Sequence, residues 1–399
     1  MSYQTAANIV AAVHREEAIN TQATATGATQ IRLIQSQGLE LKRANVQSAE
    51  KLATGLRSMM RLGYKTVEGG FDQEISVGGA TDIFLEAIQR NVWSTATALA
   101  FASVTTIALG TNTLTAASGD FTAWVKVGDV FSFESTSVTA DNNINRMVRS
   151  VASLTLVFTT GAFTTLSAAA TGTMTRLKKV VSPTGAFTRY SHTIEQRDTD
   201  VDVSEVFTGC RLTGVKLTFA PGQMAKMTTT FMGVDRVIES TGTSPYFTSP
   251  TLTTSIGLVA DDSSISYNGA LVGTFTSMEL NLQITAKGEP TIGSLTTADI
   301  FDNDLVGTGT ITALRSDLSN ATLFDGETEF EIGMVLQEPT GSPPNALGIY
   351  LPRVKLSALA APVGGGDGAK TETMTFSLGP KAADTTHDYG YATFSSSGA

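Results

Sequence analysis

Two runs of alternating acids are the residues whose type and spacing come closest to a recognisable chemistry. Asp198, Asp200 and Asp202 open like a calcium-binding loop, in which carboxylates at every second position coordinate the ion. Such a loop needs a glycine directly after the third acid and a bidentate glutamate six residues beyond that glycine. Val203 and Gly209 occupy these two positions, so the sequence does not predict a calcium site.

The second acidic run is Glu327, Glu329 and Glu331, which alternate with apolar residues: Phe330, Ile332 and Met334. Side chains at every second position of a strand face the same side, so the pattern predicts an acidic face opposite an apolar one. A solvated strand surface is the usual meaning of such a face. Both acidic runs could line a channel only in an assembly that has a lumen.

The remaining reactive residue types are scattered along the chain. The three histidines (His14, His192 and His387) stand in separate segments, and the single cysteine, Cys210, has no evident partner base. No metal-binding histidine pair, nucleophile elbow or phosphate-binding loop occurs, and the glycine-rich run 363–368 lies between two strand patterns. We therefore predict no catalytic residue, no metal site and no cofactor. Two carboxylates distant in sequence could still meet in space.

The composition argues against several classes of protein. The 399 residues carry a formal net charge of −10, which argues against a protein that wraps nucleic acid with clustered Lys and Arg. No apolar run approaches the roughly 20 residues of a membrane-spanning helix. A single cysteine excludes a disulfide framework. The first 20 residues lack the apolar core of a signal peptide, so we expect folding in a cytoplasm.

Short strand patterns dominate the chain, and the clearest helix is predicted over residues 80–93. Ile83, Phe84, Ala87 and Ile88 share one face of that helix. Residues 9–17 are expected to form about two helical turns. Residues 95–178 look like a self-contained insertion, which indicates a small all-β barrel or sandwich. Its strands are predicted at 105–109, 129–135, 146–150 and 154–159.

An internal repeat organises the rest of the sequence. The strand, Pro/Gly loop and returning strand of residues 215–233 recur in outline at 354–379. Upstream, residues 69–84 match residues 309–324 at a constant spacing, including Gly69 with Gly309 and Phe84 with Phe324. Two matches in the same order predict a duplicated unit of strands and a helix, with the first copy split by the insertion.

Several segments taken together resemble the major tail tube proteins of long-tailed bacteriophages. The first are MSYQTAANI at the N-terminus, SMMRLGYKTVEGGFDQEISVGGATDIFLEAIQRNVW at 58–93, WVKVGDVFSF at 124–133 and SEVFTGCRLTGVKLTFAPGQMAKMTTTFMG at 204–233. In the second half, SLTTADIFDNDLVGTGTITA at 294–313 and LPRVKLSALAAP at 351–362 resemble the same family. The resemblance covers nearly the whole chain and is specific in combination rather than through one motif.

The resemblance implies a mainly β fold: a duplicated tail-tube β-sandwich domain with a flanking helix, plus an inserted small all-β domain. The first tail-tube domain is expected at residues 1–94 and 179–240, with an N-terminal arm over 1–60. The inserted domain is expected at 95–178 and the second tail-tube domain at 241–399.

The resemblance also implies a structural virion protein that polymerises into stacked rings. These rings form the tail tube, the conduit for genome delivery, and the resemblance favours a non-contractile tail. A duplicated chain favours trimeric, pseudo-hexameric rings over hexamers. Expected partners are further copies of the chain, the tape measure, tail terminator and distal tail proteins, and double-stranded DNA that passes through the lumen without specific binding. We expect no membrane partner and no enzyme activity, and a location in the virion tail after assembly from the host cytoplasm.

Within that assembly, the candidate lumen-lining acids are Asp198, Asp200, Asp202, Glu327, Glu329 and Glu331. The alternative function is a β-rich tail-tip or surface adhesion protein. Such a protein would favour clusters of exposed aromatic residues, whereas aromatic residues make up 7% of this chain, and Trp93 and Trp124 stand in apolar patterns. A β-rich hydrolase is the third possibility, and no motif supports it.

Overall fold

The main body of the chain consists of antiparallel strands, which confirms the predicted mainly β fold. The computed structural model describes the chain except for residues 1–4, 6–7, 35–36, 101–106, 135–138, 160–162, 164–165, 170–171, 241, 364–367 and 399. Every pairing between its named strands is antiparallel. No closed barrel occurs within the part of the chain described.

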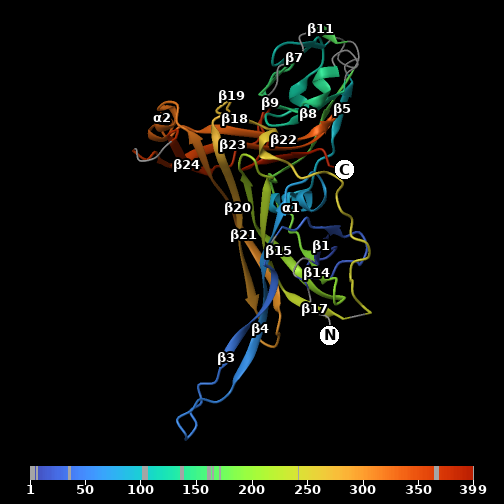
Figure 1. Cartoon of the computed structure of the whole chain (residues 1–399), viewed down its shortest axis with the longest axis vertical. Coiled ribbons are helices and arrows are strands. Elements are labelled where there is room, and N and C mark those ends of the chain that lie inside the picture. The colour runs from blue at the N-terminus through green and yellow to red at the C-terminus, as the bar shows by residue number, and fades with distance from the viewer. Residues whose placement is uncertain are drawn as a thin grey trace.

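The largest layer is a sheet of eight long strands, which we call the main sheet. Its strand order is β3-β4-β16-β15-β20-β21-β24-β23. The bounds are β3 (Gly38–Gln47), β4 (Met60–Glu74), β15 (Val203–Phe219), β16 (Lys226–Gly233), β20 (Phe275–Pro290), β21 (Thr297–Leu314), β23 (Pro344–Ala360) and β24 (Thr371–Leu378). In Figure 1 the strands β4, β15, β20 and β21 run along the long axis of the molecule, and the hairpin of β3 and β4 extends beyond the body at one end.

Two strands leave the main sheet part-way and enter a second layer. The first half of β15 pairs with β14 (His192–Asp198) and β17 (Asp235–Glu239), and β14 continues to β1 (Ile9–Arg15) and the short β2 (Thr29–Gln30). The first half of β23 pairs with β22 (Phe330–Gly341) and β25 (Thr393–Ser396). These extend to β18 (Ser263–Tyr267), β19 (Ala270–Leu271) and β13 (Lys178–Val181). Both bends coincide with bulges, which change the direction of a strand.

The hydrophobic core lies between the apolar face of the main sheet and this second layer. The helix α1 (Gly79–Gln89) contributes to the core, with Phe84 fully buried and its ring 5.5 Å from that of Phe231 on β16. This confirms the helix predicted over 80–93, which ends a few residues early at a left-handed Arg90. A shorter helix, α2 (Ser319–Asp325), lies against β23 and has no buried residue.

The predicted helix over residues 9–17 is wrong, because this segment forms β1 instead. Ala11, Ala12 and Val13 are buried, and β1 pairs with the whole of β14. Two turns of isolated helix are only marginally stable, so a full strand ladder and burial on both faces outweigh the local helical tendency. Of the segment 1–60, the part that extends away from the body is the β3 side of the β3–β4 hairpin.

Residues 97–176 form a separate small sheet with a core of its own. Its strand order is β11-β6-β7-β10-β9-β8-β12-β5. The bounds are β5 (Thr97–Ala100), β6 (Ile107–Leu109), β7 (Thr113–Ala116), β8 (Val130–Glu134), β9 (Arg146–Val151), β10 (Thr155–Phe158), β11 (Leu166–Ala169) and β12 (Thr173–Arg176). The 3-10 turns are Phe121–Ala123 and Thr139–Asn143 here, and Ala260–Asp262 before β18. Strands predicted at 129–135, 146–150 and 154–159 are confirmed as β8, β9 and β10, and the first part of the strand predicted at 105–109 lies outside the described residues.

Candidate functional site

The face of the main sheet that points away from the core is polar and rich in hydroxyl groups. Residues that alternate with buried ones along the strands are half-buried or exposed there. They are mostly threonine, serine and carboxamide side chains: Thr218, Thr228, Thr230, Asn281, Gln283, Thr308, Thr310, Thr312, Thr373, Thr375, Ser357 and Ser377. Because the ladder between β15 and β20 sets Leu217 opposite Leu280, the alternation stays in phase and the polar face is continuous across all eight strands.

Charges on this polar face are mostly neutralised by neighbours. Lys42 Nζ lies 2.8 Å from Glu68 Oε2, and Lys216 Nζ lies 2.9 Å from Glu279 Oε2. The Thr228 hydroxyl donates a 2.5 Å hydrogen bond to Asp72 Oδ1. The hydrogen bond with Glu68 raises the pKa of Lys42. The face therefore offers neither a cluster of free cations nor a strongly acidic surface.

The predicted run Glu327, Glu329 and Glu331 lies at the β23 edge of the polar face, around the start of β22. Each carboxylate has a partner on β23: Lys355 Nζ lies 2.5 Å from Glu327, Arg353 binds both oxygens of Glu329, and the Tyr350 hydroxyl donates to Glu331. The lysine lowers the pKa of Glu327, and the arginine that of Glu329. Glu329 and Glu331 lie at the start of β22, whereas Glu327 stands in the preceding turn with a left-handed backbone, so the run is not a single strand face. Cationic partners compensate Glu327 and Glu329.

The second predicted run, Asp198, Asp200 and Asp202, does not form an extended acidic face. The segment is the tight turn between β14 and β15, and Asp202 has a left-handed backbone. Asp200 accepts hydrogen bonds from the Thr5 backbone N–H and the Asn8 amide, which lower its pKa, whereas burial raises the pKa of Asp198. This turn precedes the half of β15 that belongs to the second layer, so the structure does not bring the two acidic runs together.

The acids of the polar face, among them Glu68, Asp72 and Glu279, do not stand in acidic runs, so the sequence pattern did not predict them. Asp72 and Glu279 each stand between two buried residues, and Glu68 follows the buried Val67. A signal was present for Asp72, which alternates with Phe71 and Gln73 in a predicted strand. Reading the polar partners of each apolar stripe, strand by strand, would have found this face.

Cys210 has a histidine neighbour that the sequence did not reveal. His192 on β14 lies opposite Cys210 on β15, and both residues are buried. Burial lowers the pKa of His192 to about 4 and raises the pKa of the Cys210 thiol well above its usual value. A neutral thiol beside a weakly basic imidazole is not an activated nucleophile, so the pair is a packing contact of the core.

The buried His192 predicts an acid-sensitive core. The unfolded chain binds a proton with the ordinary histidine pKa of 6.5, while the folded chain resists protonation down to about 4. Stability should therefore fall by about 3 kcal/mol as the pH drops through this window, at 1.4 kcal/mol per unit of pKa difference. His192→Phe should remove that loss, because phenylalanine does not titrate. Urea unfolding of both unassembled proteins between pH 7 and 4 measures the effect, and parallel curves would contradict it.

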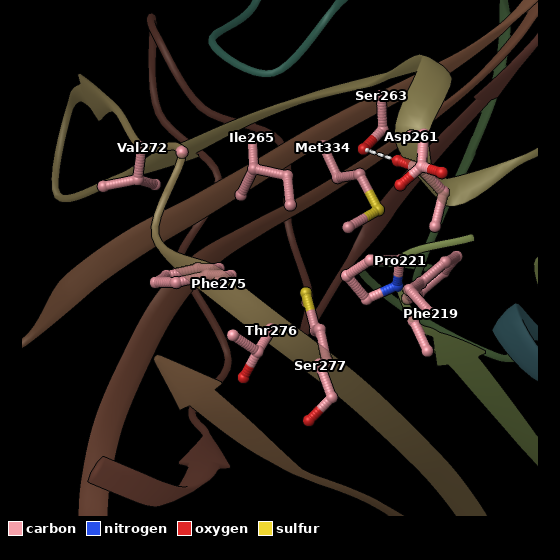
Figure 2. Close-up of a pocket in the computed structure, with 14 residues that line it drawn as sticks. Phe219, Pro221, Asp261, Ser263, Ile265, Val272, Phe275, Thr276, Ser277 and Met334 are labelled. Carbon is pink, nitrogen blue, oxygen red and sulfur yellow. Dashed lines mark hydrogen bonds between the residues drawn. The ribbon is translucent and has the colours of Figure 1, made fainter. Parts of the chain in front are cut away.

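A hollow of about 210 Å³ opens where β15 ends and β20 begins, beside β18. Figure 2 shows Phe219, Ile265, Val272, Phe275 and Met334 around it. The nearby Asp261 carboxylate accepts a hydrogen bond from the Gly222 N–H, which stabilises the β15–β16 turn. The lining is mixed, with Asp261, Ser263 and Thr276 beside the apolar side chains, and these lining residues form no arrangement of acid, base and nucleophile.

Comparison with known proteins adds evidence beyond geometry. Within the described residues, no group of three or more His, Cys, Asp or Glu side chains could hold a metal ion, and no helix is long and apolar enough to cross a membrane. No curated protein matches the chain. A family model described as phage tail tube protein matches residues 6–378.

Proposed function

The chain belongs to the phage tail tube protein family, and from this premise we propose that its copies assemble into stacked rings that conduct the genome. Membership makes the chain a structural protein of the virion tail. The observation that supports rings is the main sheet, which has one covered apolar face, one uncovered polar face and two edges that lack a full strand partner among the described residues. Joining such edges between copies removes an aggregation hazard and closes the sheet around a channel.

We propose that the chain contains two tail-tube domains, residues 1–94 with 179–240 and residues 241–399. The order of pairing supports this, because β3-β4-β16-β15 is repeated as β20-β21-β24-β23. A helix follows β4 and another follows β21, and β15 and β23 both continue into the second layer. Three chains would then supply six domains, which favours trimeric rings over hexamers.

Residues 95–178 form the proposed inserted domain, on the outside of the tube. It interrupts the first domain but rests on the second: Val127, Val130 and Met147 pack against Val335 and Tyr350. The insertion is therefore a brace between the two halves of one chain. Figure 1 shows it beyond β22 and β23, away from the main sheet's long strands.

The polar face is the proposed wall of the channel. Tight binding of DNA needs clustered Lys and Arg, and this face carries hydroxyl groups and paired charges instead. Double-stranded DNA can then slide along it without specific binding. Of the six acids predicted from the sequence, Glu327, Glu329 and Glu331 remain candidates for the channel, because they border the polar face.

Adding cations to this wall should slow the passage of DNA. Thr230→Lys with Thr310→Lys places two lysines on the polar face of β16 and β21, where both side chains point away from the core. We expect normal tubes and ejection slowed several-fold at low salt, with recovery at high salt, because phosphate contacts are screened. Ejection kinetics of virions measure this. Glu17→Lys with Asp325→Lys, at exposed positions outside the face, is the control, and equal slowing by both variants would reject the assignment.

Stacking is the proposed role of the apolar residues at the end of the long strands. Ile292 is fully exposed at the tip of the β20–β21 hairpin, and Met59 is 87% exposed near the tip of the β3–β4 hairpin. The apolar hollow of Figure 2 lies at the other end of β20. Head-to-tail contact of such surfaces propagates a filament rather than closing a dimer.

Ile292→Asp should weaken stacking without unfolding the chain. The side chain makes no contact that would be lost within one copy, because it is fully exposed. A buried carboxylate at the ring-to-ring contact would be costly, so we expect single rings or much shorter tubes. Electron microscopy counts the rings per tube. Ile292→Val is the matched control, and tubes of normal length from Ile292→Asp would remove this tip from the contact.

Electron microscopy of the purified chain and of virions tests the function as a whole. Hollow rings with three-fold symmetry and six lobes are expected, both alone and along the tail shaft. Rings of six chains would keep the tube and reject the trimer. Absence of the chain from the tail shaft would reject the proposal. The tape measure, tail terminator and distal tail proteins are the further proposed partners, with assembly from the host cytoplasm, and antibody labelling along the shaft locates the chain between them.

A further inference from the structure

The main sheet ends at two edges that have no strand partner within the described chain. At one edge, β3 pairs only with β4. At the other edge, β23 pairs with β24 as far as Ala360. On its opposite side, β23 pairs with β22 only between Pro344 and Val354. Open edges present unpaired N–H and C=O groups, which readily accept another strand.

We propose that β23 of one copy pairs antiparallel with β3 of the next, with Leu359 opposite Leu41. This inference rests on the proposed ring assembly and assigns its lateral interface. The partner is a second copy of this chain, and the template is the β15–β20 junction inside each copy. In that junction, Val215 lies opposite Leu282.

The register follows from matching ladders in the two halves. Leu39 lies opposite Gly69 as Leu280 lies opposite Gly309. The β3–β4 ladder slips between Arg43 and Asn45, and the β20–β21 ladder slips at the corresponding place, between Ile284 and Ala286. Position 41 of β3 therefore corresponds to position 282 of β20.

The same comparison relates β23 to β15. Leu212 lies opposite Phe231 as Leu356 lies opposite Phe376. Bulges follow at the matching places, after Leu212 and after Leu356. Position 359 therefore corresponds to Val215, and the pair of Val215 with Leu282 becomes Leu359 with Leu41 across two copies.

Burial supports this pairing. Val215 and Leu282 are each 1% exposed inside the chain, whereas Leu41 and Leu359 are only half-buried apolar residues at the edges. The two helices differ in burial in the same way. α1 contacts both β15 and β20, and its Phe84 is fully buried, while Phe324 of α2 is 37% exposed. A second β3 beside β23 would cover the positions that are open in one copy.

The hydrogen bonds of Leu39 indicate where the proposed ladder between β3 and β23 begins. The Gln196 amide accepts a 2.7 Å hydrogen bond from the Leu39 N–H and donates one to the Leu39 carbonyl. The main-chain groups of Leu39 therefore point to the outer edge, and those of Leu41 and Arg43 point the same way because the direction alternates along a strand. Leu39 is already satisfied, so pairing starts at Leu41. On the other edge, the residue opposite Leu39 would come after Ala360, where β23 ends, so β23 also stops at the start of this ladder.

Cysteine cross-linking in assembled tubes tests the register directly. Leu41→Cys with Leu359→Cys places two thiols on directly opposed positions, within the Cα separation that a disulfide spans. Cys210 is fully buried and does not interfere. After mild oxidation we expect dimers and trimers on a denaturing gel, with no band beyond three chains in a trimeric ring. Arg43→Cys with Leu359→Cys is the matched control, displaced by two residues on the same side.

A charge series on the polar face provides an independent measure that needs no oxidation. The register sets Ala358 opposite Lys42 and Ala360 opposite Glu40, and all four side chains are exposed in one copy. Ala358→Glu and Ala360→Lys should lower the critical concentration of assembly, and Ala358→Lys and Ala360→Glu should raise it. The expected change is about two- to fivefold each way, the effect of a cross-strand charge pair.

The outcomes separate this inference from the proposed function. Tubes that form but cross-link through the displaced control pair, or not at all, overturn the register and leave the tube intact. The register is also overturned if Glu and Lys do not change the critical concentration in opposite directions at positions 358 and 360. If the unmodified chain forms no rings and is absent from the tail shaft, the proposed function fails instead. Cross-linked bands that stop at six chains would support the pairing in a larger ring.

Discussion

Lys179→Met is expected to lower the free energy of unfolding by about 3–5 kcal/mol, the cost of leaving a buried charge without its partner. Lys179 Nζ lies 2.6 Å from Asp129 Oδ1 and 2.6 Å from Asp388 Oδ2, and Asp129 is fully buried. The lysine on β13 thus joins the insertion to the C-terminal segment. Urea unfolding of the unassembled chain measures the loss.

The pH dependence of this variant distinguishes lost charge compensation from lost packing. Burial raises the pKa of Asp129, and Lys179 opposes that rise. Without the lysine, the folded chain binds a proton at Asp129 more tightly than the unfolded chain does. The deficit of the variant against the unmodified chain should therefore narrow as the pH falls from 7 towards 5, since His192 affects both proteins equally.

Lys65→Met is the matched control for Lys179→Met. Lys65 Nζ lies 2.7 Å from Asp235, in a pair that is about one quarter exposed on each side. Partly exposed pairs contribute about 0–1 kcal/mol, so this variant should change stability little. Equal losses from both variants, or a deficit that does not depend on pH, would contradict a role for buried charge at Lys179.

Gly69→Ala is the second change with a large expected effect, about 3 kcal/mol or more, from backbone strain together with a steric clash. Gly69 has φ of +142°, and a Cβ added there would lie 2.1 Å from the Gly38 carbonyl oxygen on β3. The neighbour is backbone, so the clash cannot be relieved by a change of rotamer. The variant should unfold at lower urea and form no tubes.

Two other glycines make this test specific. Gly222 has φ of +69° and open space around it, so Gly222→Ala should cost about 1 kcal/mol of left-handed strain alone. Gly273 has neither a positive φ between +20° and +160° nor an atom near the added Cβ, so Gly273→Ala should be close to neutral. If Gly69→Ala resembled Gly273→Ala, the close approach of β3 and β4 would not limit the sheet.

Sequence patterns predicted those parts of the fold in which local tendency and burial agree. The helical stripe of Ile83, Phe84, Ala87 and Ile88 and the alternating hairpins after 215 and 354 satisfy both. The helix predicted over residues 9–17 is wrong because the local helical tendency stabilises this segment less than pairing with β14 does. That partner lies far away in sequence, and a local pattern does not contain it.

The candidate site was harder to predict for a related reason. Arg353 and Lys355 neutralise Glu329 and Glu327 from the next strand, which a list of acids does not show. Asp198, Asp200 and Asp202 have the spacing of a strand and the geometry of a turn. The polar face consists mostly of threonine, serine and carboxamide side chains, which carry no charge signal, and it is visible only when eight strands are set side by side.

The β15–β20 junction has a consequence for how rapidly a tube can grow. Its two strands belong to one chain, so their effective concentration is set by the connecting residues 220–274 and not by the amount of protein in the cell. In the proposed trimeric ring of two-domain chains, every second joint between neighbouring domains is then complete before two copies meet. Only the joints between chains remain subject to dilution, and this makes ring closure less dependent on protein supply than it would be for six separate subunits.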